Sequence, residues 1–177
     1  MQKKKHAFNM IEIVLALGII AVGITGVLGI LPVAVTSSKS AVGDSYAADA
    51  ANTFLSYIEA IVRDNWSNLP NQPTAGNYHK TDPETLSSPI TPEGDIEIFD
   101  LGGGGYAVRI KDGDVSVFAA EIRIQTSDIT DFAIGTSTGT IPNSMAKRVA
   151  VEVSWPLNAP DENREKRVFI REFFRNY

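Results

Sequence analysis

Residues 8–35 read FNMIEIVLALGIIAVGITGVLGILPVAV, and Glu12 is the only charged residue in this stretch. From Ile13 to Val35 the chain is apolar apart from Thr25. A run of about 20 apolar residues is long enough to cross the hydrocarbon core of a bilayer as a helix. A helix that is apolar all round over this length does not suit the core of a small domain. The stretch therefore predicts a transmembrane helix over residues 8–35.

Three lysines precede this stretch. Residues 1–7 read MQKKKHA, with Lys3, Lys4 and Lys5 in a row. Positive charge beside a membrane helix favours the cytoplasmic side, so these lysines predict that the rest of the chain lies across the membrane. A secretory signal peptide has a shorter apolar region of about 7–15 residues followed by a small-residue cleavage site. A plain single-pass anchor, in contrast, fits both the length and the lysines.

The plain anchor does not explain Glu12. A carboxylate at the centre of a bilayer costs roughly 2.5–3.5 kcal/mol and less near the interface, so such a group is by default functional and has a partner. If the chain is cut between Ala7 and Phe8, the new ammonium group of Phe8 lies four residues before Glu12. The two charges could then neutralise each other, within one helix or between neighbouring subunits.

The order of these features resembles the N-terminal signal of type IV prepilins and type II secretion pseudopilins. The resemblance rests on K-K-K-H-A followed by F-N-M-I-E and a long uncharged span. It implies that prepilin peptidase cuts at Ala7–Phe8 and methylates Phe8. It also implies that Glu12 neutralises the amine of an adjacent subunit during assembly. The family usually has Gly at the position of Ala7, which is also a small residue.

The resemblance implies a structural filament subunit that is held in the bacterial inner membrane as a precursor and then in a periplasmic or cell-surface filament. Its partners would be prepilin peptidase, other pilin or pseudopilin subunits, the inner-membrane assembly platform and, before assembly, membrane lipid. One alternative is an uncleaved single-pass anchor with an outer binding domain, and another is a subunit of a DNA-uptake filament. The net charge of −5 argues against nucleic acid as a direct partner.

The apolar pattern changes beyond residue 40. Apolar residues then recur at spacings of three and four, with charged and polar residues between them. This is the pattern of an amphipathic helix that packs one face on a sheet. We predict a helix over residues 36–64 that continues the helix of residues 8–35, so that a membrane-spanning half and an amphipathic half form one long helix. The apolar positions are Tyr46, Ala47, Ala50, Ala51, Phe54, Leu55, Ile58, Ile61 and Val62.

Pro32 and four glycines lie in the apolar half. A proline inside a helix removes one backbone hydrogen bond, so we predict a kink at Pro32. Three of the glycines are spaced by three and fall roughly along one face, where small residues would let membrane helices approach closely. Alternatively, they reflect only the general frequency of glycine in membrane helices. The glycines are Gly18, Gly23, Gly26 and Gly29.

The remaining chain predicts a connection and a sheet. Residues 65–94 contain five of the nine prolines, which indicates a long irregular connection. Alternating patterns over residues 95–177 predict four or five antiparallel strands covered on one face by the amphipathic helix, an α+β fold. Residues 127–144 are rich in Gly, Thr and Ser and predict a loop. The strands are expected at 95–101, 106–111, 115–125, 147–155 and 167–174, with a hairpin turn at Asp112-Gly113.

The last two predicted strands resemble the C-terminal hairpin of minor pilins and of I-type minor pseudopilins. They read K-R-V-A-V-E-V-S-W-P and K-R-V-F-I-R-E-F-F. This resemblance implies a low-copy subunit of the filament.

Residue types that often carry chemistry form no recognisable site. The glycine run 102–105 lacks the Lys and Ser/Thr of a phosphate-binding loop. Asp112 and Asp114 lack the terminal Glu of a calcium-binding EF-hand. His6 and His79 stand alone in the sequence, and there is no cysteine. We therefore predict a non-enzymatic protein with no cofactor and no metal site.

Overall fold

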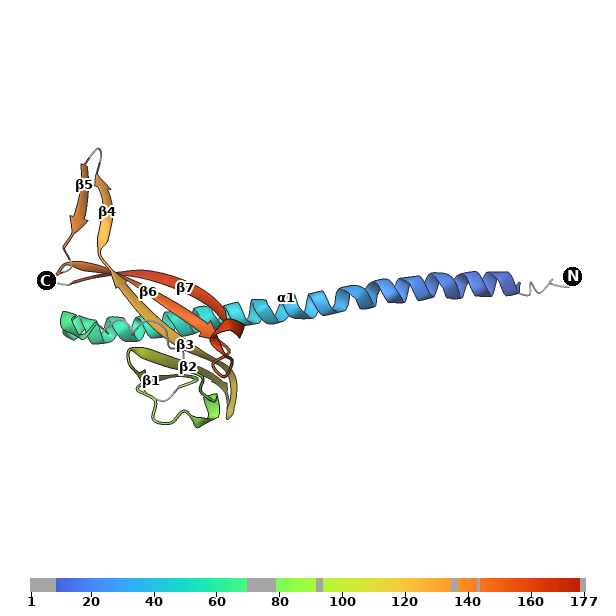
Figure 1. Ribbon diagram of the computed structural model, residues 1–177, viewed down its shortest axis with the longest axis horizontal. Coiled ribbons are helices and arrows are strands. Elements are labelled where there is room, and N and C mark those ends of the chain that lie inside the picture. The colour runs from blue at the N-terminus through green and yellow to red at the C-terminus, as the bar shows by residue number, and fades with distance from the viewer. Residues whose placement is uncertain (1–8, 70–78, 92–93, 135–136, 143, 176–177) are drawn as a thin grey trace, which may run out of the picture. The chain divides into compact units, whose positions relative to one another are not determined.

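The structure of the protein, a computed structural model, describes residues 9–69, 79–91, 94–134, 137–142 and 144–175 (Figure 1). The chain divides into two compact units, residues 1–42 and 43–177. The predicted leader peptide, residues 1–7, and Phe8 lie outside the described residues. This applies to Lys3, Lys4, Lys5, Ala7 and Phe8.

One helix, α1, runs from Met10 to Asp64. It joins the two predicted halves without a break, so the prediction of a continuous helix is confirmed. Pro32 lies inside the helix, which continues past it. The hydroxyl of Thr36 donates to the carbonyl oxygen of Pro32 at 3.0 Å, which keeps this polar side chain satisfied within the helix. The kink at Pro32 stays a prediction.

The five-stranded sheet is antiparallel and has the order β1-β2-β3-β6-β7. Pairing of β3 with β6 joins the hairpin β1–β2 to the hairpin β6–β7, because residues 129–141 do not take part in this sheet. The α+β fold and the antiparallel sheet predicted from the sequence are thus confirmed. The strands are β1 (Ile96–Gly102), β2 (Gly105–Asp112), β3 (Val115–Ser127), β6 (Ala146–Trp155) and β7 (Glu165–Phe174).

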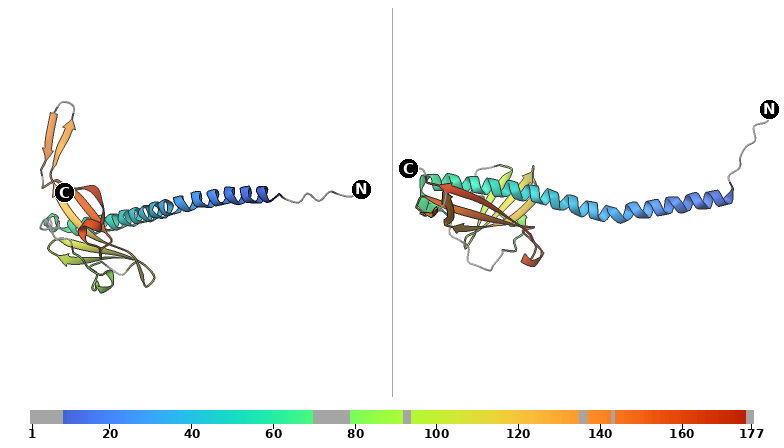
Figure 2. Two further views of the ribbon diagram at one scale, coloured as in Figure 1. Left: turned by 45° about the vertical axis from the view of Figure 1, so that its right-hand side comes forward. Right: turned by 90° about the horizontal axis from the view of Figure 1, so that it is seen from above.

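The main core lies between the sheet and the C-terminal half of α1, which Figure 2 shows lying along the sheet. Phe54 and Ile58 of the helix are fully buried, as are Val149, Val151 and Val153 of β6. Three small helix residues in the same stripe, Ala47, Ala50 and Ala51, are also fully buried. The buried helix positions are those of the predicted apolar stripe.

The prediction of a loop over residues 127–144 is wrong. The structure contains a second, two-stranded sheet formed by β4 (Ile129–Ile134) and β5 (Ser137–Ile141). Threonine and isoleucine are abundant here and favour extended backbone, so the strand propensity of these residues outweighs the turn signals of Gly and Ser. β3 also extends to Ser127, two residues beyond its predicted end.

The described part of the connection between helix and sheet is not simply solvated. It contains two short 3-10 helices, η1 (Trp66–Asn68) and η2 (Pro83–Thr85). Leu86 packs against a small second core on the far face of the sheet. The backbone N–H of Ile90 donates to the carbonyl oxygen of Ile98 at 2.7 Å, which occupies part of the outer edge of β1. Both faces of the sheet are therefore covered at β1–β3.

Candidate functional site

The N-terminal part of α1 exposes apolar side chains on all sides. Every residue from Met10 to Val35 is exposed, and Val22 keeps 75% of its surface accessible. A soluble helix that packs on a core hides one apolar stripe, as the second half of α1 does. This segment hides none, and by length and composition it could cross a membrane. The segment is therefore compatible with anchoring the protein in a membrane.

Glu12 occupies the first turn of α1 and closes a reciprocal cap. The backbone N–H of Asn9 donates to Oε2 of Glu12 at 3.1 Å, and the N–H of Glu12 donates to the carbonyl oxygen of Asn9 at 2.9 Å. A carboxylate at this third helical position resembles the second half of a capping box and sits where the helix dipole favours negative charge. The carboxylate thus has a structural partner in its own helix. The spacing Asn9-x-x-Glu12 signals this cap in the sequence.

Thr25 interrupts the apolar segment between Ile13 and Val35, and its side chain is hydrogen-bonded within the helix. The hydroxyl of Thr25 donates to the carbonyl oxygen of Ala21 at 2.8 Å, which lowers its cost in an apolar environment. A Cβ added at any of the four glycines would meet nothing within 4 Å. These glycines therefore lie open to a neighbouring helix or to lipid, and their packing role stays a prediction.

A second notable group is the buried carboxylate of Glu121 on β3. Its side chain is fully inaccessible, as is that of Arg164. Nη1 of Arg164 lies 2.8 Å from Oε2 of Glu121, and Nε of Arg123 lies 3.1 Å from Oε1. His79 adds its backbone N–H at 2.8 Å and its Nδ1 at 3.2 Å. The burial of a charged carboxylate is tolerated when it has this many charged and hydrogen-bonding partners.

Arg164 also holds the connection between β6 and β7. Its guanidinium donates to the carbonyl oxygens of Leu157 at 2.8 Å, Ala159 at 2.9 Å and His79 at 2.6 Å. Three chain segments are thus joined at one side chain. The cluster has a structural role, because its donors and acceptors are directed at one another and hold these segments together.

Sequence reasoning missed this cluster and set His79 aside. The available signal was Glu121 itself, which follows the apolar run Val117–Ala120 and precedes Ile122. Its alternation with Arg123 and Gln125 placed it on a polar face, and the sequence does not show that Leu157 and His79 cover that face. Among the described residues, no group of three or more His, Cys, Asp or Glu side chains is arranged to hold a metal ion.

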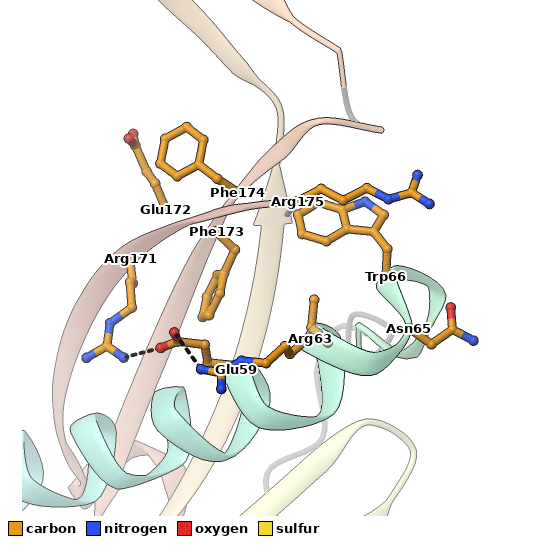
Figure 3. Close-up of a pocket in the computed structure, with 10 residues that line it drawn as sticks. Glu59, Arg63, Asn65, Trp66, Arg171, Glu172, Phe173, Phe174 and Arg175 are labelled. Carbon is orange, nitrogen blue, oxygen red and sulfur yellow. Dashed lines mark ion pairs between the residues drawn. The ribbon is translucent and has the colours of Figure 1, made fainter. Parts of the chain in front are cut away.

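A pocket of about 430 Å³ lies at the C-terminal end of α1 (Figure 3). Glu59 lies between the guanidinium groups of Arg63 and Arg171, at 3.7 and 3.8 Å. Trp66 of η1 and Phe173 of β7 add aromatic surface to the lining. The other lining residues are Val62, Asn65, Glu172, Phe174 and Arg175. This pocket combines cations with apolar walls, which suits a small anionic group.

Glu97 gives the domain a pH dependence that can be measured. Burial alone would raise the pKa of Glu97, but hydrogen bonds from Lys111 Nζ and Arg109 Nε, both at 2.7 Å, and the positive charges of these side chains outweigh burial and hold the pKa below its ordinary value. A depressed pKa stabilises the fold above the unfolded-state pKa, and this contribution is lost as the pH falls through the folded-state value. Glu97→Gln should therefore destabilise the protein at pH 7, and the difference should shrink at pH 3.

Urea unfolding of the natural and variant proteins at both pH values checks this expectation. Glu84→Gln, at an exposed position of η2, is the matched control and should show little difference at either pH. An equal effect of Glu97→Gln at pH 7 and pH 3 would contradict the role of the charge.

Comparison of the chain with protein-family models, curated proteins and solved structures gave no match.

Proposed function

We propose that this protein is a structural subunit of a type IV pilus-like or type II secretion pseudopilus filament. The observation that carries the proposal is the exposed apolar segment of α1 with a single carboxylate, Glu12, at its start. The order of a basic leader, Ala7, Phe8 and Glu12 before this segment gives further support. The resemblance of the last two strands to minor subunits favours a low-copy role.

The proposed mechanism has an order. Lys3, Lys4 and Lys5 orient the precursor in the inner membrane. Prepilin peptidase then cuts at Ala7–Phe8 and methylates the amine of Phe8. Glu12 neutralises the amine of an adjacent subunit, and the assembly platform transfers the apolar segment from lipid into a bundle of helices.

The cap at Glu12 is compatible with this mechanism. Only Oε2 accepts the N–H of Asn9, so the carboxylate retains acceptor capacity for a second partner. A charged amine brought to this exposed carboxylate in an apolar surrounding would be attracted more strongly than in water. The same contact removes the cost of placing an uncompensated charge among apolar helices.

The alternative is an uncleaved single-pass anchor whose outer domain binds a ligand. The pocket beside Trp66 is the observation that favours a binding role. This alternative gives no function to Ala7 and Phe8, whereas the filament subunit does.

Processing by prepilin peptidase tests the proposal. Co-expression of the full chain with an active peptidase should shorten it by seven residues, and an inactive peptidase should leave it intact. Ala7→Arg places a large charged side chain before the cut and should prevent shortening, while Gln2→Arg in the same leader serves as the control. Failure of the active enzyme to shorten the natural chain would favour the anchored binding domain. Mass spectrometry of the purified chain measures whether the seven residues have been removed.

A further inference from the structure

The strand β7 forms one edge of the five-stranded sheet, and no described strand lies beyond it. In an antiparallel pair, only every second residue exchanges backbone hydrogen bonds with the partner strand. The N–H of Arg175 donates to the carbonyl oxygen of Met145 at 2.8 Å, in register with the pairing of β6 and β7. The odd-numbered residues of β7 are therefore those that bond to β6. The backbone groups of the even-numbered residues, among them Val168, Ile170 and Phe174, point away from the sheet.

The same three residues form an apolar strip on the face of the sheet that does not pack on α1. Side chains alternate between the two faces along a strand, so Val168, Ile170 and Phe174 share one face. They are 58%, 63% and 61% exposed, whereas the intervening Phe173 is buried in the core beneath α1. Ala150 of β6 lies opposite Ile170. An exposed apolar strip beside an open strand edge is a surface that suits a further extended chain.

The opposite edge of the sheet is closed at its centre. The carbonyl oxygen of Ile98 on β1 accepts the N–H of Ile90 at 2.7 Å, and the N–H of Ile98 donates to the hydroxyl of Thr91 at 3.1 Å. The connection before β1 thus uses the backbone groups that a further strand would need. Copies of this chain therefore do not join β7 to β1 in a row, in agreement with the low-copy role proposed above.

A symmetric pair of copies through β7 does not suit a filament. Arg167 contacts Asp44 and Arg171 contacts Glu59, so β7 runs in the same direction as α1. Antiparallel pairing of two β7 strands about a twofold axis would set the two α1 helices in opposite directions. Under the proposed function, all subunits enter the membrane in one orientation. A different chain is therefore the better partner for β7.

We propose that β7 receives an extended segment of a different subunit of the same filament as a sixth strand of this sheet. The backbone donors and acceptors of that segment pair with those of Val168, Ile170 and Phe174. Its apolar residues occur at every second position and cover the exposed strip. Regular backbone pairing gives such a contact its affinity, and the alternate side chains give it specificity.

The area of the contact indicates that a second attachment holds the partner. An added strand along the ten residues of β7 covers a strip about 33 Å long and, with its side chains, about 10 Å wide. This is less than half of the about 800 Å² that each partner buries in a typical stable interface. Subunits joined through their apolar helices already lie side by side, which raises the effective concentration of the segment. The inference therefore rests on the proposed function.

Photo-cross-linking of the full chain in assembled filaments tests the contact. A photoreactive phenylalanine analogue replaces Val168, Ile170 or Phe174, one position in each sample. We expect an adduct with one other filament subunit, located by mass spectrometry of its peptides. Strand pairing predicts that the attachment point moves along the partner by about two residues from position 168 to 170 and by about four from 170 to 174, in one direction. The analogue in place of Val115, which is also exposed, is the control and should give no adduct with that segment.

Ile170→Pro and Ile170→Thr separate the backbone from the side chain. Both remove the apolar side chain, but only proline removes the N–H. This N–H points away from β6, where an edge strand tolerates proline. With the analogue at position 174, Ile170→Pro should lower the adduct about tenfold, and Ile170→Thr should lower it only about two- to threefold. Urea unfolding shows whether each variant is folded, and if Ile170→Pro is not, the register of the attachment points decides.

The mass of each sample distinguishes the two failures. Chains cut before Phe8 and assembled, with adducts that are absent, scattered along the partner or formed with a second copy of this chain, would overturn the strand addition and leave the filament function intact. Chains that remain uncut would overturn the filament function and the inference with it.

Discussion

Arg164→Met is expected to lower the free energy of unfolding of the domain by about 3–5 kcal/mol, because it leaves the carboxylate of Glu121 buried without its closest cation. Both side chains are fully inaccessible, so water cannot replace the lost contact. The carbonyl oxygens of Leu157, Ala159 and His79 lose their donor as well. A loss of this size is a large part of the total stability of an ordinary domain.

Urea unfolding of the full chain in detergent, followed by the fluorescence of Trp66 and Trp155, measures this loss. Arg148→Met removes a surface ion pair with Glu172 and is the control, with an expected effect below about 1 kcal/mol. The double variant Arg164→Met with Glu121→Leu should be more stable than the single variant Arg164→Met, because it leaves no buried charge. An effect of Arg164→Met no larger than that of Arg148→Met would show that the cluster does not hold the domain together.

Glu12→Gln is expected to abolish assembly into filaments while insertion in the membrane and cleavage at Ala7–Phe8 continue. The amide oxygen of glutamine can still accept the N–H of Asn9, so the cap of α1 is retained. What is lost is the negative charge that the proposed mechanism requires for pairing with the amine of a neighbouring subunit.

Quantification of the protein in sheared filaments and in membranes separates the two roles of Glu12. Glu12→Asp keeps the charge on a shorter side chain and should assemble in part. Thr25→Val, a change within the apolar segment that leaves Glu12 intact, is the control and should assemble normally. Normal assembly of Glu12→Gln would mean that this residue serves only as a helix cap.

The parts of the fold that depend on local patterns could be predicted from the sequence. The spacing of Ala47, Phe54 and Ile58 defines one helix face, and these side chains are buried against the sheet. The alternation of apolar and polar residues along β1, β2, β3, β6 and β7 is also a local pattern, because it depends only on residues within the same strand. The strands β4 and β5 were missed because the Gly and Ser residues of this segment were read as turn signals, although Thr and Ile, which favour strands, are more numerous within the two strands.

The parts that depend on distant residues could not be predicted. Arg164 and Glu121 are 43 residues apart, and no pattern in either segment indicates the pairing. The pocket beside Trp66 needs the end of α1 and the end of β7 at one place, which follows only from the order of strands in the sheet. The reciprocal cap between Asn9 and Glu12, in contrast, is local and its spacing was visible.

The mass of the protein recovered from its native membrane tests the central claim most directly. The proposed function predicts a chain that lacks Met1–Ala7 and begins at Phe8 with one additional methyl group on its amine, found both in the membrane and in sheared filaments. A chain that still begins at Met1, in cells whose prepilin peptidase is active, would contradict the claim and leave an anchored domain.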